Sequence, residues 1–337
     1  MESLYPLLFK PNLREVVWGG NRLKPLKGMP ADGVPIGESW EVSSLPERES
    51  IVSNGPLAGR RLNDLTGERT EQILGQAVAR KYGNRLPLLV KLIDARQDLS
   101  IQVHPNDAMA QRLHGTRGKT EMWYIIGAEP GASVLAGFSR PLTPQKYAQS
   151  VEDGTICDYL ARHSIRPGDA IYIPAGRVHA ICGGTQLVEV QESSDVTYRI
   201  YDYNRPGIDG KPRELHTDLA AQTINYEDVG TRLIRTPAQP DQVAGIIRSP
   251  FFNINILQLT RPIRRKMLQH DTFVILVCIQ GSVSIEPRIE GSSSAILAAG
   301  SVDVSALVPA AVADYDLVPL TPETRILEAY IDFLVDK

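Results

Sequence analysis

Three segments of the chain carry side chains that can bind a divalent metal ion. The segment "SIQVHPND" places Gln102 and His104 two residues apart, "GKTEMWYII" carries Glu121, and His179 follows a turn rich in glycine and proline. Residues two apart in a strand share a face, so Gln102 and His104 are expected to point the same way. Two imidazoles, a carboxylate and an amide oxygen suit zinc with one position left open for a substrate.

These residues need strands to hold them. Glu121 begins an apolar run and shares a face with Trp123 and Ile125, and the Pro-Ala-Gly turn before His179 should deliver that residue to the start of another strand. The dozen or more polar residues between His104 and Glu121 are expected to form a loop. The remaining histidines have no comparable context and are interpreted as surface or ordinary hydrogen-bonded residues: His114, His163, His216 and His270.

Composition bounds the class of protein. The chain has 337 residues, 42% of them hydrophobic and 22% charged, with a net charge of −3. Its longest basic cluster, "RPIRRK", is too short to indicate a nucleic-acid surface. The start of the chain lacks the pattern of a signal peptide, and no window approaches the ~18 apolar residues of a membrane span. Three cysteines without a C-x-x-C pair predict buried thiols and a cytoplasmic protein with no membrane partner.

Short apolar runs rich in Val and Ile, separated by Gly and Pro, favour an all-β fold of sandwich or jelly-roll type. Examples are "LPLLVKLID", "AIYIPAG", "TQLVEVQE" and "FVILVCIQGSVSI". Two stretches are expected to be helical. The first covers 62–83, and the second covers 143–163, with Thr143 suited to an N-cap and Gly154 as an interruption.

The second part of the chain resembles the first. "FVILVCIQGSVSI" parallels "MWYIIGAEPGASVL", and the stretch 298–315 parallels 166–181 with only Ala and Val in the place of His179. A Pro-rich polar segment at 236–245 separates the two parts. We therefore expect a catalytic domain over 1–240 and a second barrel over 241–337 that lacks metal ligands.

The segment from Gly168 to His179 matches the second cupin motif, and "QVHPND" with Glu121 resembles a modified first motif. Together with "LPLLVKLIDARQDLSIQVHPND", "GKTEMWYIIG", "GESWEVS" and "SDVTYRIYDYNR", these motifs resemble type I mannose-6-phosphate isomerases of the short bacterial form, strongly over 5–220. The resemblance implies two cupin-type jelly-roll barrels with a few helical decorations. It also implies that Gln102, His104, Glu121 and His179 are the ligands of Zn²⁺.

The same resemblance implies an active-site arginine at Arg199 and substrate contacts from Asp195 and Lys119. Glu38 and Ser39 of "GESWEVS" are expected to line the pocket. If 195–203 formed one strand, Asp195, Arg199 and Tyr203 would share a face. The sequence leaves open whether Lys91 extends from a strand to solvent or contacts the site.

The implied activity is the interconversion of mannose 6-phosphate and fructose 6-phosphate through an enediol, with zinc as Lewis acid and Arg199 as a fixed positive charge. The partner is then a small sugar phosphate, with no nucleic acid. The residues alone do not identify the proton-transferring base or the oligomeric state. Two alternatives stay open: another cupin metalloenzyme such as an oxygenase, and a sugar-binding cupin without catalysis.

Overall fold

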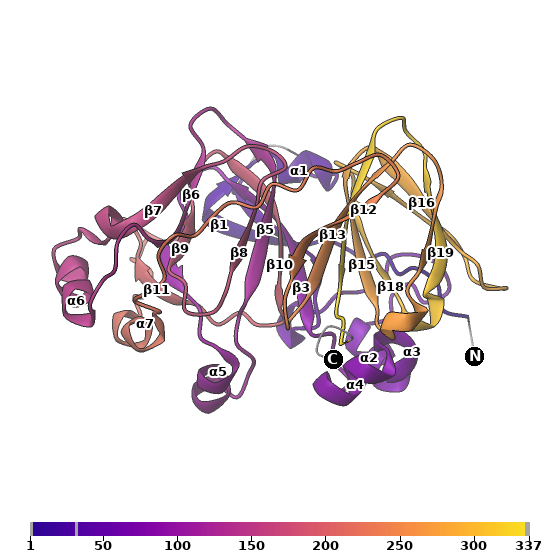
Figure 1. The fold of residues 1–337 in the computed structure, drawn as a ribbon, viewed down its shortest axis with the longest axis horizontal. Helices are drawn as coiled ribbons and strands as arrows, with labels where there is room; N and C mark the ends of the chain where they lie inside the picture. The colour runs from indigo at the N-terminus through magenta and orange to yellow at the C-terminus, as the bar shows by residue number, and fades with distance from the viewer. Residues whose placement is uncertain (1–2, 31–32, 334–337) are drawn as a thin grey trace.

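The protein is described here by a computed structural model that covers residues 3–30 and 33–333. Within these residues the strands form four antiparallel sheets, and helices cover their ends and edges. Figure 1 shows the strands β1 to β11 on one side of the molecule and the orange to yellow strands β12 to β20 on the other, with helices α2, α3 and α4 of the first part lying beneath the second. The protein is therefore mostly β with a few helices, in agreement with the sequence.

The first part of the chain forms a six-stranded and a five-stranded sheet. The six-stranded sheet has the order β1-β2-β3-β10-β5-β8 and the five-stranded sheet β11-β4-β9-β6-β7. Their bounds are β1 (Asn12–Gly20), β2 (Ile36–Val42), β3 (Leu88–Ala95), β4 (Ile101–Val103), β5 (Glu121–Ala128), β6 (Ser133–Phe138), β7 (Leu160–Ser164), β8 (Ala170–Ile173), β9 (His179–Ile181), β10 (Thr185–Glu192) and β11 (Tyr198–Tyr201).

The second part of the chain repeats most of this strand order. Its five-stranded sheet, β12-β13-β20-β15-β18, corresponds to β2-β3-β10-β5-β8, and its four-stranded sheet, β14-β19-β16-β17, corresponds to β4-β9-β6-β7. The bounds are β12 (Val243–Arg248), β13 (Asn253–Leu259), β14 (Ile263–Lys266), β15 (Val274–Gln280), β16 (Ser282–Pro287), β17 (Ala295–Ala298), β18 (Ser305–Val308), β19 (Asp314–Pro319) and β20 (Thr324–Tyr330). The internal resemblance read from the sequence thus has a counterpart in topology.

The pairing corrects one detail of that resemblance. His179 begins β9 and faces Gln102 of β4, whereas Asp314 begins β19 and faces Lys266 of β14. The residue in the place of His179 is therefore Asp314, not Ala or Val, and its carboxylate is paired with Arg264 at 2.5 Å.

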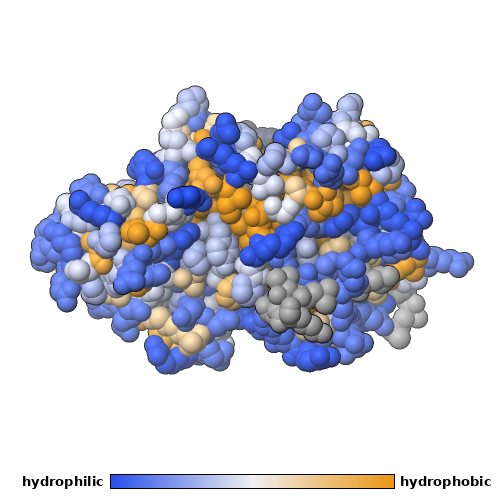
Figure 2. Space-filling model, viewed as in Figure 1, coloured by the Kyte–Doolittle hydropathy of each residue, from blue (hydrophilic) through white to orange (hydrophobic). Residues whose placement is uncertain are grey.

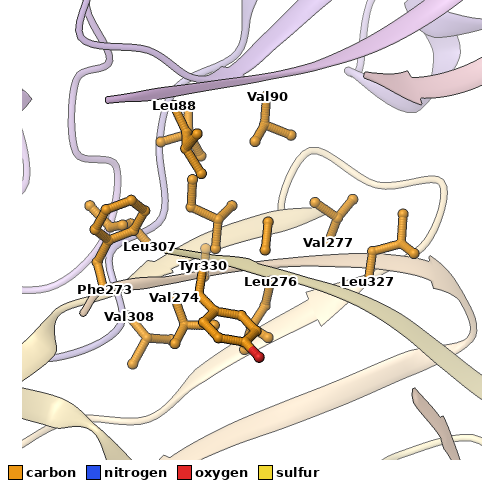
Figure 3. Packing of buried hydrophobic residues seen from close by; sticks show 14 of the residues in the cluster. Leu88, Val90, Phe273, Val274, Leu276, Val277, Leu307, Val308, Leu327 and Tyr330 are labelled. Carbon is orange, nitrogen blue, oxygen red and sulfur yellow. The ribbon is translucent and has the colours of Figure 1, made fainter. Parts of the chain in front are cut away.

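The six-stranded sheet is buried on both faces, which explains why "LLVKLIDA" of β3 reads as a continuous apolar run. On one face Ile93 and Trp123 pack against Val134 of the neighbouring sheet. On the other face Leu88 and Val90 point toward the second part of the chain, where Val277 and Leu327 point back toward them, while Val274, Leu276 and Tyr330 lie on the opposite side of their sheet (Figure 3). The two parts consequently share one large core.

The helices agree only in part with the sequence. The stretch 62–83 is helical as three short helices, α2 (Leu62–Glu68), α3 (Thr70–Leu74) and α4 (Gln76–Tyr82). In the second stretch α6 (Pro144–Glu152) is capped by the Thr143 side chain, which accepts from the Lys146 backbone N–H, and Gly154 has a φ of 70°. Beyond it the chain forms the 3₁₀ turn η2 (Ile156–Tyr159) and then β7, so the helical prediction was wrong there.

Three helices were not predicted. They are α1 (Leu23–Leu26), α5 (Asp107–His114) and α7 (Thr217–Thr223), and shorter 3₁₀ turns occur at η1 (Pro46–Arg48), η3 (Leu268–His270) and η4 (Ala310–Val312). The polar stretch between His104 and Glu121 is thus not only loop. Asn106 caps α5 by accepting from Met109 N–H, a signal that the sequence contained.

The surface of the molecule is more polar than the core between the sheets. Figure 2 shows a face that is mostly hydrophilic, with hydrophobic residues gathered in a band over the region where the two parts of the chain meet. Among residues 3–30 and 33–333, no helix has the length and apolar composition needed to span a membrane.

Candidate active site and metal centre

The five-stranded sheet of the first part brings the predicted metal ligands to one place. Gln102 lies directly opposite His179 on β4 and β9, and His104 follows β4 by one residue. Glu121 begins β5 in the facing sheet. The nitrogen and oxygen atoms that His104, Glu121 and His179 offer lie within 4.8 Å of one another, and all three residues are buried. Three of the four predicted ligands therefore form one cluster.

Hydrogen bonds fix how the two imidazoles face Glu121. Nδ1 of His104 donates to the Val196 carbonyl at 3.0 Å, and Nδ1 of His179 donates to the Arg177 carbonyl at 2.9 Å. A carbonyl can only accept, so each Nδ1 carries the proton and each Nε2 keeps a lone pair. Both Nε2 atoms lie 3.4 Å from an oxygen of Glu121. This is the orientation that metal-binding histidines adopt when a carbonyl holds the other ring nitrogen.

The polar atoms at the centre of the cluster have no hydrogen bond. They are Nε2 of His104 and both carboxylate oxygens of Glu121, and all three are buried; Oε2 has an ion-pair partner, the Lys119 ammonium at 3.2 Å. A buried polar atom without a partner costs roughly 1–3 kcal/mol, so Nε2 of His104 and Oε1 of Glu121, side by side in one spot, indicate a missing binding partner. The cluster could bind a metal ion, because each orphaned atom is a lone-pair donor directed at the others.

Gln102 borders this group. Its Nε2 atom lies 3.2 Å from Nε2 of His179. The two ends of an amide are exchangeable by a flip about the last bond, which would present its oxygen to the same point. Gln102 is therefore placed to bind, and its role as a ligand stays a prediction.

The charges at the cluster suit metal binding. Burial, together with the Lys119 ammonium, lowers the pKa of His104 to about 3, and burial also lowers the pKa of His179. For Glu121 burial would raise the pKa, but the Lys119 ammonium, whose Nζ lies 3.2 Å from Oε2, holds it well below its usual range. The cluster thus consists of two neutral imidazoles and a carboxylate, the protonation states that a metal requires.

A cavity of about 250 Å³ adjoins the cluster, with Gln102 in its wall. The substrate-binding residues expected from the sequence, Glu38, Lys119 and Asp195, line it together with Arg199. Glu38 accepts from Trp40 Nε1 at 2.7 Å; burial would raise its pKa, but Lys91 and Arg14 lower it below the usual value. Four of the residues expected at the site thus share this cavity with Gln102, which borders the metal-binding cluster.

Two expectations about neighbouring residues were wrong. Ser39 is buried on the other face of β2, where its hydroxyl donates to Glu41 at 2.6 Å, so it does not line the cavity. The stretch 195–203 is not one strand, since β11 covers only Tyr198–Tyr201 and Tyr203 has a φ of 57°. Tyr203 is absent from the cavity wall because the chain turns away after β11.

The structure also resolves the position of Lys91. It is buried in the cavity wall, 3.1 Å from Oε1 of Glu189, with its ammonium 4.8 Å from the centre of the Trp40 ring. Lys91, Glu189 and Trp123 lie side by side in the register of β3, β10 and β5. Lys91 thus contacts the site rather than solvent.

Sequence reasoning missed Glu189, Arg14 and Arg213, which also line the cavity. Glu189 gave a usable signal, because it is an ionisable residue inside the apolar run "TQLVEVQE" and a buried charge usually has a function or a partner. Arg213 gave none, since it lies in a polar stretch outside the recognised motifs. Its Nε donates to Asp202 at 2.7 Å, which holds it near the end of β11.

The sequence is similar to those of known mannose-6-phosphate isomerases. The model of the family "Phosphomannose isomerase type I, catalytic domain" matches residues 7–124. The mannose-6-phosphate isomerase of Bacillus subtilis (strain 168) is 35% identical over 279 residues, which cover 82% of this chain and 86% of that protein. The mannose-6-phosphate isomerase of Streptococcus mutans is 32% identical over 284 residues, covering 83% and 87%.

A solved structure shows the same relationship. The crystal structure of the mannose 6-phosphate isomerase from Bacillus subtilis superposes with a TM-score of 0.85 at 29% identity, covering 97% of this chain and 100% of the other. Fold and site define a mostly β isomerase with a buried group that could bind a metal. The chain belongs to the type I phosphomannose isomerase family.

Proposed function

We propose that the protein interconverts mannose 6-phosphate and fructose 6-phosphate at this cavity. The observation that carries the proposal is the set of orphaned atoms on His104 and Glu121 beside a cavity rich in cations. The named relatives are mannose-6-phosphate isomerases, which supports the choice of substrate.

We infer that zinc is held by His104, Glu121 and His179, with Gln102 as the fourth contact. Imidazole and carboxylate donors suit this ion, and both histidines are already in the required tautomer. The ion would polarise the sugar oxygens at C1 and C2 as a Lewis acid. The other steps fall to residues of this chain.

The cavity has an excess of positive charge that suits a phosphate. Five cationic side chains face three carboxylates there: Arg14, Lys91, Lys119, Arg199 and Arg213 against Glu38, Glu189 and Asp195. Arginine forms planar paired contacts with phosphate oxygens or a developing oxyanion. We assign Arg199 to this task because its Nε lies 3.3 Å from the Ser100 hydroxyl in the cavity wall, which holds the guanidinium beside the Gln102 strand.

We assign the proton transfer to Glu189. Burial and the nearby Glu121 charge raise the pKa of its carboxyl, which makes it a stronger base than an ordinary carboxylate. Lys91 is the weaker candidate, since Glu189 and Glu38 outweigh burial and raise its pKa, so it stays protonated. In the forward direction the carboxylate takes the proton from C2 of the open aldose to give an enediolate and returns it to C1, while the hydroxyl proton of O2 moves to O1, so the ketose forms with no net gain or loss of protons.

The architecture belongs to the same proposal. We propose that the two pairs of sheets are two cupin-type jelly rolls, a catalytic one over 1–240 and a metal-free one over 241–337. The repeated strand order supports this reading. The Ala170–Ile234 bridge supports assigning residue 234 to the first part, whereas Pro240, at the end of that part, already pairs with Gln258 of the second.

The test is a coupled isomerase assay on the purified protein, before chelation, after chelation and after zinc is added back, with metal content measured at each stage. We expect turnover to fall with the metal and to return with zinc. Absence of turnover in fully loaded protein would contradict the reaction, whereas full turnover by metal-free protein would contradict only the role of zinc. An oxygenase would instead consume O₂ without isomerising the sugar.

A further inference from the structure

Arg199 lies on the outer strand of its sheet and is held there by a residue far along the chain. β11 pairs with β4 on one side and is the first strand in the sheet order, so within the described residues no strand lies beside its other edge. At this edge the backbone N–H of Arg199 donates to Nδ1 of His216 at 3.2 Å, and the backbone N–H of His216 donates to the Arg199 carbonyl at 2.7 Å. One histidine thus satisfies both outward backbone groups of Arg199.

The same segment holds the Arg199 side chain. Its Nη1 donates to the Glu214 carbonyl at 2.7 Å, while Nε lies 3.3 Å from Ser100 Oγ on the opposite side. The segment is itself fixed, because Arg213 Nε donates to Asp202 at 2.7 Å just after β11. The guanidinium therefore has a defined direction only while residues 213–216 stay against the strand.

His216 occupies a position that usually serves another purpose. It is the N-cap of α7, where Ser, Thr, Asp or Asn normally accepts a hydrogen bond from the first turn, yet its side chain makes no cap hydrogen bond. The imidazole instead accepts from Arg199. A backbone N–H can only donate, so Nδ1 must be unprotonated. The helix start is left without its side-chain cap, and the histidine is used to fix the arginine.

We propose that His216 is a positioning residue that holds Arg199 in the direction needed for catalysis. Its neutral imidazole accepts the hydrogen bond from the Arg199 backbone N–H that a carbonyl of a neighbouring strand would otherwise accept. The inference rests on the proposed function, because the positioning matters to turnover only if Arg199 acts on the substrate. It goes beyond that function in giving a task to a histidine that belongs neither to the cavity lining nor to the group of possible metal ligands.

The test compares His216→Ala with His216→Asn, each alone and combined with Arg199→Ala. Alanine removes the acceptor, whereas an asparagine side-chain oxygen can accept from the same N–H and can also cap α7. We expect His216→Ala to lower kcat about tenfold with little change in KM or metal content, since small displacements of a catalytic group cost up to about 10²-fold. His216→Asn should restore most of kcat, and His216→Ala should cost nothing further in the Arg199→Ala background.

His163→Ala is the matched control, because His163 also makes one hydrogen bond to the backbone but lies on β7, away from the cavity.

Equal kcat for His216→Ala and wild type, or additive losses in the double variant, would overturn the proposal. Crystal structures of wild type and His216→Ala give a readout independent of turnover: a guanidinium that stays within about 0.5 Å of its place overturns the inference even if the enzyme is inactive. If His216→Ala fails to fold, the asparagine variant decides, since low turnover in a folded His216→Asn protein with an unmoved Arg199 contradicts the proposal. Loss of isomerase activity in wild type would contradict the proposed function instead.

Discussion

Arg199 and Gln102 lie directly opposite each other on the neighbouring antiparallel strands β11 and β4, and Gln102 in turn faces His179 on β9. The register of three strands therefore aligns the guanidinium with the metal cluster in one row across the sheet. A slip of one residue would send each side chain to the other face. His179 and Gln102 are expected to bind the metal ion, whereas Arg199 is expected to act on the charge of the substrate. Single mutations along this row can therefore separate an effect on metal content from an effect on turnover alone.

Replacing His179 by alanine should remove one metal contact without disturbing the helices. We expect His179→Ala to lower zinc content and isomerase turnover together, since few strong ligands are present. Elemental analysis of the purified protein is the measurement. His163→Ala, with its imidazole outside the cluster, should retain both zinc and activity, and equal zinc in the two variants would exclude His179 as a ligand.

Replacing Arg199 should affect turnover but not metal. Arg199→Ala removes a fixed positive donor, so kcat should fall by about 10²–10³ while zinc content stays normal. Arg199→Lys should recover little, because an ammonium cannot make the planar paired contact of a guanidinium. Near-normal kcat in Arg199→Ala would show that the residue is structural, and a parallel loss of zinc would show that it supports the metal cluster.

Glu189→Gln tests the assigned base with a side chain of the same shape. A general base contributes typically 10²–10⁴-fold, so kcat should fall by about that factor with zinc retained. The variant leaves Lys91 without its partner, and we therefore expect a lower melting temperature as well. Assays well below that temperature separate the effects, and the exposed Glu227→Gln is the control. Unchanged kcat would rule out Glu189 as the base.

The shared core between the two parts predicts a cost for truncating Leu327 of β20, which is buried and lies on the face of its sheet that points toward Leu88 and Val90 of β3 (Figure 3). Leu327→Ala should lower the free energy of unfolding by about 2–5 kcal/mol, through lost burial and the cavity left behind. Denaturant unfolding measures the change. Ile296→Ala, at a side chain 55% exposed, is the matched control and should change stability by less than about 1 kcal/mol. A similar loss in both variants would contradict the shared core.

Glu192 predicts a stability change with pH. Burial, and then the nearby Asp107, raise its pKa from 4.5 to about 7. Between these two values the folded protein holds a proton that the unfolded chain has released, so the contribution of Glu192 to stability is complete below about pH 4.5 and is lost as pH rises through 7. Above pH 7 the native protein must hold a buried carboxylate.

Glu192→Gln removes this titration and can still accept from the Thr120 N–H, which lies 2.8 Å from the carboxylate. At pH 8 the variant should be more stable than wild type by on the order of 1–3 kcal/mol, with a smaller difference at pH 5. Thermal unfolding at both values is the measurement, with the exposed Glu152→Gln as control. A variant that is less stable at pH 8 would contradict the raised pKa.

The sequence by itself determined the features that local patterns control. Apolar runs predicted β3, β8, β10 and β15, because a strand buried on both faces is mostly apolar. Thr143 before Pro144 predicted the start of α6. The histidines and Glu121 could be recognised as a group from their types and from motif resemblance, since a metal site restricts its ligands to a few residue kinds.

Only the tertiary structure decided which charged residues meet. Lys91 and Glu189 are 98 positions apart and become partners through the register of β3 and β10, which no local pattern specifies. His216 looked ordinary because its task depends on the free edge of β11. Asp195 and Tyr203 were expected on one face, but a positive φ at Tyr203 and Asn204 turns the chain away. Local preference fixes which segments form strands, whereas side-chain convergence depends on long-range pairing, and that pairing is set by the packing of all the sheets together.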